Sequence, residues 1–147
     1  MTWTAPEPPP SIDGPMVGDD RPMLEGYLAW QRHELQRVCA GLTGEQLATA
    51  AQPPSNLTLL GLVRHLAKVE RIWFRIRIDA EDVEPLYDPA LGKDHDFEAL
   101  DPAQAPEAFE TFATECRLAT EAAAATRSTT RSPCTARPCR CGWSTCT

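Results

Sequence analysis

The stretch that decides the fold is residues 57–78, which reads LTLLGLVRHLAKVERIWFRIRI. Ser55 or Asn56, just after Pro53 and Pro54, is expected to cap the first free backbone amides of a helix here. The apolar residues recur at spacings of three and four, the periodicity of an amphipathic α-helix. They are Leu59, Leu62, Leu66, Val69, Trp73 and Ile76. The pattern predicts one long helix that buries an apolar face.

One histidine, His65, lies beside this apolar stripe and shares a helix face with Leu62, Val69, Ile72 and Ile76. An imidazole carried against a core needs a hydrogen-bond partner or a metal ion. For a lone histidine, a hydrogen-bonded structural role is the commoner outcome. The residues alone leave both interpretations of His65 open, structural and metal-ligating.

The basic residues of the same helix, Arg64, Lys68, Arg71 and Arg75, are expected to form its solvated side. Glu70 lies five positions after His65, which is not a same-face spacing. It is interpreted as a solvated carboxylate or as one that pairs with another helix.

A second helical pattern precedes this stretch and ends near Gly41. Thr43, with Gln46 three residues later, fits a capping box for a short helix that continues through Ala51. The apolar positions of the first of these two helices are Leu24, Leu28, Leu35, Val38 and Leu42.

A third long helix is predicted to start at Asp101 and Pro102, after an acidic, irregular segment over residues 79–100 that Leu86, Tyr87 and Phe97 are expected to pin to the surface. The apolar positions of this helix are Phe109, Phe112, Cys116, Ala119 and Ala123. An up-and-down bundle needs a fourth helix to cover the remaining apolar face. We therefore expect the faces that carry Leu62, Val69, Phe109 and Phe112 to stay partly uncovered.

The last 22 residues cannot supply that helix. Residues 126–147 hold nine Ser or Thr and no Leu, Ile, Val, Met or Phe, and all 21 acidic residues lie at or before Glu121. We predict a proline-rich arm over residues 1–20, a helical domain over 21–125 and an irregular Cys/Arg/Ser/Thr-rich tail over 126–147. The fold class is all-α: an up-and-down helical bundle that is incomplete, with three long helices and the fourth missing or replaced by the tail.

Four of the six cysteines lie in the tail with the spacing Cys-x4-Cys-x-Cys-x4-Cys: Cys134, Cys139, Cys141 and Cys146. Four thiolates can close a structural zinc site, but the usual Cys-x2-Cys pair is absent. Exposed thiols are the favoured interpretation, and a zinc-binding tail is the alternative. Cys39 and Cys116, on helices, are expected to be small buried apolar residues.

Composition limits the classes of function. The chain has 147 residues, 42% of them hydrophobic, and a net charge of −7. An acidic chain lacks the basic face that nucleic acid requires, so no nucleic-acid partner is expected. No apolar run is long enough to span a membrane, and the N-terminus shows no signal peptide, which indicates a cytoplasmic protein without a membrane partner.

Several separate segments resemble, in order, the DinB/YfiT-like superfamily, in particular the branch labelled mini-circle proteins. They are residues 21–28 (RPMLEGYL), 39–43 (CAGLT), 53–57 (PPSNL), 60–71 (LGLVRHLAKVER) and 73–74 (WF), and the likeness covers about residues 18–125. The resemblance implies a four-helix bundle in a family of metal-dependent proteins. Some members are low-molecular-weight-thiol transferases or isomerases acting on small molecules.

In such families three histidines bind a divalent metal, zinc or nickel, with one on the second helix and two on the fourth. His65 matches the second-helix ligand, whereas His33 and His95 match neither of the others. The resemblance therefore implies one metal ligand, His65, and it assigns no catalytic or cofactor-binding residue. We expect the metal site to be incomplete, with divalent metal bound poorly or not at all. The alternatives are a non-catalytic, truncated remnant and the zinc-binding tail. The substrate stays unidentified, and uncovered apolar surface is expected to favour a homo-oligomer.

A reading-frame change near residues 126–130 would account for the tail. Every cysteine codon begins with TG, so in the frame one base earlier each gives NTG, which encodes Leu, Met or Val. Trp143 changes in the same way, and apolar residues return at positions 139, 141, 143 and 146 whatever the codons. We therefore predict that the alternate frame encodes the missing amphipathic helix with its histidines.

Overall fold

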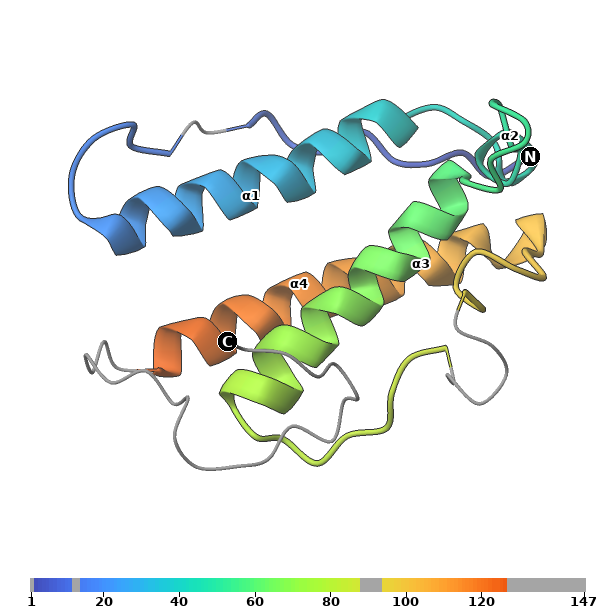
Figure 1. Ribbon diagram of the computed structural model, residues 1–147. Helices are drawn as coiled ribbons and strands as arrows, with labels where there is room; N and C mark the ends of the chain where they lie inside the picture. The colour runs from blue at the N-terminus through green and yellow to red at the C-terminus, as the bar shows by residue number, and fades with distance from the viewer. Residues whose placement is uncertain (1, 12–13, 88–93, 127–147) are drawn as a thin grey trace.

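The computed structural model describes residues 2–11, 14–87 and 94–126 (Figure 1). Within these ranges the chain is helical and contains no β-strand; the one isolated β-bridge joins Thr4 and Thr43. The predicted all-α class is confirmed. The elements are α1 (Asp20–Cys39), α2 (Gly44–Leu47), α3 (Leu59–Glu70), η1 (Arg71–Ile78), η3 (Pro102–Gln104) and α4 (Ala105–Ala125). None of the described helices is long and apolar enough to cross a membrane.

The long central helix is confirmed, with two differences in detail. It begins two residues later than predicted, at Leu59, because Thr58 is its cap: Oγ1 of Thr58 accepts a hydrogen bond from the backbone N–H of Gly61 at 2.9 Å. Ser55 instead accepts from the N–H of Leu57 in the preceding turn. The last eight residues, η1, continue α3 as a π-helix. This form is rare overall, but where it occurs it is often found at functional sites.

The face of the central helix that packs most tightly is not the predicted stripe. Leu60, Val63 and Ala67 are fully buried, and α3 makes its main contact with α4. The predicted stripe lies on the other side and is half-buried, with Trp73 52% exposed. Because α3 is apolar on both sides, periodicity alone could not show which side α4 covers.

The core lies between α3 and α4 and includes Phe109 and Phe112. The expectation that these two phenylalanines stay partly uncovered is therefore wrong. The N-terminal segment helps to cover them: the ring of Trp3 packs edge-on against Phe109, with 5.6 Å between centroids. Ala5 is buried and its backbone pairs with Gly41 and Leu42, which fixes the segment beside the start of α2.

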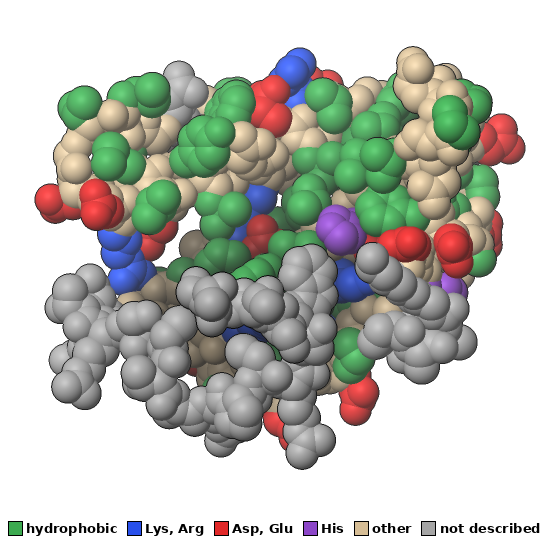
Figure 2. Space-filling model, in the orientation of Figure 1, with side chains coloured by type: hydrophobic (Ala, Val, Ile, Leu, Met, Phe, Trp, Pro, Cys, Tyr) green, Lys and Arg blue, Asp and Glu red, His purple; other side chains and the backbone are tan. Residues whose placement is uncertain are grey.

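Helix α1 lies along one side of the α3–α4 pair (Figure 1) and is attached to it mainly through arginines. Arg21 donates hydrogen bonds to the backbone carbonyls of Ala123 and Thr126 near the end of α4. Arg32 binds Glu70 of α3. Part of the apolar stripe predicted for α1 is exposed, including Leu24 at 69%. Figure 2 shows hydrophobic side chains gathered over this side of the molecule.

The short helix α2 confirms the predicted capping box. Oγ1 of Thr43 accepts from the N–H of Gln46, and the Gln46 side chain accepts from the N–H of Thr43. The helix ends at Leu47, before the predicted Ala51. The predicted domain boundaries at residues 20 and 125 stay a prediction, and the tail beyond residue 126 lies outside the described residues.

Candidate functional site

The candidate site is centred on His65, in the middle of α3. Its Nδ1 lies 2.5 Å from Oδ2 of Asp96, and Nζ of Lys68 lies 3.0 Å from the other carboxylate oxygen, Oδ1. Lys68 is three residues after His65, so both side chains project from the same side of α3. The two residues hold one carboxylate between them.

Asp96 reaches the helix because a turn over residues 94–97 packs tightly against α3. The ring of Phe97 lies 5.1 Å from the imidazole of His65, between centroids. A Cβ atom at Gly61 would come within 2.6 Å of Cδ1 of Phe97, so only glycine admits this close approach. Gly61 lies one helical turn before His65 and thus seats the turn that carries Asp96.

The environment of Asp96 favours an ionised carboxylate. Asp96 is only 1% exposed. Burial on its own would raise the pKa of Asp96, but the hydrogen bonds from His65 and Lys68 outweigh it and bring the pKa below the ordinary value. The His65 side chain, by contrast, is 38% exposed. One edge of the imidazole is held by a buried anion while the ring remains open to solvent.

The other two histidines lie elsewhere. His33 is on α1, where its Nε2 lies 3.0 Å from the carbonyl oxygen of Pro9, and its side chain is largely buried. His95 precedes Asp96 in the turn, and its carbonyl oxygen accepts a hydrogen bond from Arg64. In the described ranges neither joins His65 in a cluster of ligands.

The metal centre that the family resemblance implies needs three protein ligands close together. Among residues 2–11, 14–87 and 94–126, no three His, Cys, Asp or Glu side chains come together in a way that could hold a metal ion. A metal-ligating histidine almost always donates its other ring N–H to a carboxylate, a backbone carbonyl or a water, and Asp96 is such a carboxylate. The described residues thus contain one suitable ligand and its orienting anion, but they do not fit a complete three-ligand site.

A buried ionic network that the sequence did not reveal lies further along the same helix, in η1. Glu115 of α4 accepts hydrogen bonds from Arg71 at 2.6 Å and from Arg75 at 2.9 and 3.1 Å. Arg75 also binds Glu81 with two nitrogens. These bonds, led by the one to Glu81, outweigh burial and raise the pKa of Arg75. The expectation that Arg71 and Arg75 are solvated is wrong, since both are drawn inward by a carboxylate 40 or more residues away.

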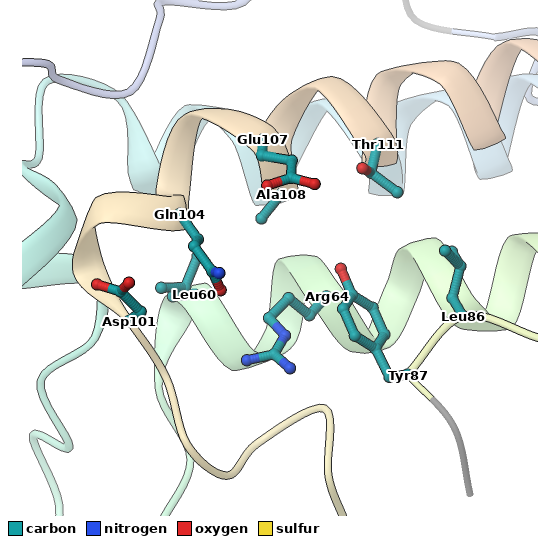
Figure 3. A pocket seen from close by; sticks show the side chains of 9 residues that line it. All are labelled: Leu60, Arg64, Leu86, Tyr87, Asp101, Gln104, Glu107, Ala108 and Thr111. Carbon is teal, nitrogen blue, oxygen red and sulfur yellow. The ribbon is translucent and has the colours of Figure 1, made fainter.

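A small cavity of about 160 Å³ lies between α3, α4 and the acidic segment (Figure 3). The guanidinium of Arg64 lies 4.5 Å from the ring centroid of Tyr87, a cation–π contact that closes one side. Leu86 also lines it, so the expectation that Leu86, Tyr87 and Phe97 pin this segment is confirmed. Asp101 and Glu107 make the opposite side acidic.

The two cysteines in the described residues are free and do not form part of the site. Cys39 is fully buried, and burial raises its pKa to about 11. Burial, with the nearby negative charge of Glu70, raises the pKa of Cys116 to about 12. Cys39 is a small buried apolar residue, as predicted, whereas Cys116 is only partly buried. The four tail cysteines lie outside the described residues.

The fold and the site define an all-α bundle protein with a carboxylate-held histidine on its central helix. The comparison with protein families is consistent with that class: the family model described as Mycothiol-S-transferase matches residues 23–144. The chain belongs to the mycothiol S-transferase family, a DinB/YfiT-like family as the resemblance predicted. Comparisons with curated proteins and with solved structures found no match.

Proposed function

We propose that this protein is a thiol-S-transferase-type helical bundle. In this proposal His65 is one ligand of a divalent metal centre, and the chain does not supply the remaining ligands. Family membership supports the thiol-transferase class. The observation that carries the role of His65 is the 2.5 Å contact between its Nδ1 and the buried carboxylate of Asp96. Such a pair orients an imidazole for ligation through its other nitrogen.

The small number of side chains that could ligate a metal supports an incomplete centre. A catalytic metal site commonly uses three protein ligands and keeps one position open. The sequence contains three histidines; the imidazole of His33 lies against the carbonyl oxygen of Pro9, and neither His33 nor His95 joins His65 in a group of three possible ligands among the described residues. Residues 127–147 add no histidine or carboxylate side chain, only thiols.

Isothermal titration calorimetry with zinc, nickel and manganese tests this proposal on the full chain. We expect no tight stoichiometric binding, and no change in the heats on His65→Ala. Tight binding at one site per chain that His65→Ala abolishes would contradict the incomplete centre. The matched control is His33→Ala, because that imidazole lies on another helix and contacts a backbone carbonyl.

The tail supplies the second candidate, a zinc-binding segment on a helical scaffold, because four of the six cysteines lie within residues 134–146. Zinc binding that survives His65→Ala but is lost on Cys139→Ala would favour it. If neither metal binding nor transfer of a thiol to an electrophilic carbon is detected, the protein is the non-catalytic remnant. A cytoplasmic location and the lack of nucleic-acid or membrane partners are proposed on the charge and hydropathy of the sequence. A homo-oligomeric state is proposed on the exposed apolar surface, and membership of the mini-circle branch on the resemblance of the quoted segments.

A further inference from the structure

We propose that Asp96 is the positioning residue of His65: it accepts the hydrogen of Nδ1 and so leaves Nε2 as the nitrogen that the imidazole presents to a ligand. This inference concerns the tautomer of the ring, and it rests on the proposed function only for what the ligand is. Asp96 lies 31 residues from His65 along the chain.

The direction of the hydrogen bond follows from the partners of Asp96. Its Oδ1 binds the ammonium of Lys68 at 3.0 Å, and its Oδ2 lies 2.5 Å from Nδ1 of His65. An ionised carboxylate has only acceptors, so the hydrogen of this bond is on Nδ1. In a neutral imidazole, hydrogen on Nδ1 leaves Nε2 with a free lone pair.

The His65 ring is placed so that part of it is open to solvent. Asp96 is 1% exposed, so the edge of His65 that it contacts is closed, while the side chain as a whole is 38% exposed. The exposed part of the side chain therefore lies away from the edge with Nδ1. Phe97 stacks at 5.1 Å against one side of the imidazole and limits rotation of the ring.

The turn that carries Asp96 is held in place independently of the hydrogen bond. Phe97 occupies the space that the missing side chain of Gly61 leaves, and Arg64 donates to the carbonyl oxygen of His95 at 3.2 Å. The carboxylate is thus delivered to His65 by packing on both sides of it. A pre-positioned acceptor costs less to order than a side chain on a free loop.

The test is the tautomer of His65, read from long-range ¹H–¹⁵N NMR spectra of the full chain without metal, over a pH series that identifies the neutral ring. We expect the Nδ1–H form to dominate in the wild type. Asp96→Ala should shift the neutral ring toward the Nε2–H form. The matched control is Asp94→Ala, which removes an exposed carboxylate from the same turn and should leave the spectrum of His65 unchanged.

Lys68→Met removes the other partner of Asp96 and leaves the Asp96 carboxylate in place. The variant therefore shows whether Asp96 alone sets the tautomer of His65. We expect the Nδ1–H form to persist in this variant. A wild-type ring in the Nε2–H form overturns the proposal without any variant. So does an Asp96→Ala protein, helical by circular dichroism, whose His65 tautomer is unaltered.

The outcomes are independent of the proposed function. If His65 is in the Nδ1–H form and tight metal binding is abolished by His65→Ala, the positioning role of Asp96 stands and the incomplete metal centre fails. If calorimetry shows no tight binding and no change on His65→Ala while the neutral ring is in the Nε2–H form, the proposed function stands and the positioning role of Asp96 fails.

Discussion

Arg32 of α1 and Glu70 of α3 form a two-point ion pair, with Nε 2.6 Å from Oε1 and Nη2 2.5 Å from Oε2. Glu70 is 7% exposed, and the hydroxyl of Thr120 on α4 accepts a further hydrogen bond from Arg32. One guanidinium therefore joins three helices. Since α1 packs few of its apolar residues inward, this contact is a main attachment of α1 to the rest of the protein.

Removing one partner of the Arg32–Glu70 pair should lower the free energy of unfolding more than removing both partners. Arg32→Met leaves a buried carboxylate without its partner, and we expect a loss of about 3 kcal/mol in the free energy of unfolding. The double variant with Glu70→Leu should recover part of the loss, measured by urea unfolding in a double-mutant cycle. As a control, Arg37→Ala breaks the exposed pair with Glu34 and should change little. Equal losses in the two arginine variants would contradict the structural role of Arg32.

Truncating a core side chain of α4 should strongly destabilise the protein. Phe112 is fully buried between α3 and α4, and Phe112→Ala leaves a cavity that is expected to cost about 3–5 kcal/mol. Trp73→Ala is the contrasting variant, because that side chain is 52% exposed and loses little burial. Thermal unfolding followed by circular dichroism compares the two. A larger loss for Trp73→Ala would show that the predicted stripe, not the Leu60 face, is the packed side of α3.

The thiols of Cys39 and Cys116 should react slowly with alkylating reagents. Only the thiolate reacts, and its fraction falls tenfold for each unit by which the pKa exceeds the pH. A pKa of about 11 for Cys39 and about 12 for Cys116, against an ordinary 9.0, lowers the thiolate population about a hundredfold and a thousandfold. Iodoacetamide labelling at pH 8, quantified for each peptide by mass spectrometry, measures this. The same chain unfolded in guanidinium provides the reference, and equal rates in both states would contradict the burial.

The exposed apolar surface of α1 should bind hydrophobic dyes and promote self-association. Met16, Leu24, Tyr27 and Trp30 line one hollow of about 570 Å³ on this side. Leu24→Lys is expected to reduce the fluorescence of bound 8-anilinonaphthalene-1-sulfonate and the sedimentation coefficient at high concentration. It should not lower the melting temperature, because Leu24 is already 69% exposed. A wild-type protein that binds no dye and sediments as a monomer would refute this.

The reading-frame prediction concerns the gene. If the tail arises from a frame change, the encoding DNA should contain, in the frame one base earlier, an open segment after about residue 126 that encodes an amphipathic helix with histidines. Sequencing the gene decides it. Stop codons in that frame, or no histidine-bearing helix downstream, would exclude a frame change. The cysteines of the tail would then have to be explained by their own chemistry.

The helices were predictable because their signals are local. Repeats of three and four place apolar residues on one side of a helix, and the pair Thr43 and Gln46 satisfies backbone groups within a single turn. The structure confirms α1, the central helix and α4 at nearly the predicted ends. The family resemblance also came from contiguous segments, and the match over residues 23–144 agrees with it.

The tertiary structure decided which of two apolar sides of α3 is buried and which polar groups meet. Periodicity states that a face is apolar, but what covers it depends on the placement of α4. Asp96 reaches His65 across 31 residues and Glu115 reaches Arg75 across 40. The sequence by itself determined the helices and one candidate ligand, His65. Only the packing of the turn at Phe97 on Gly61 determined that a buried carboxylate holds that ligand, because contacts between distant residues leave no periodic signal in the chain.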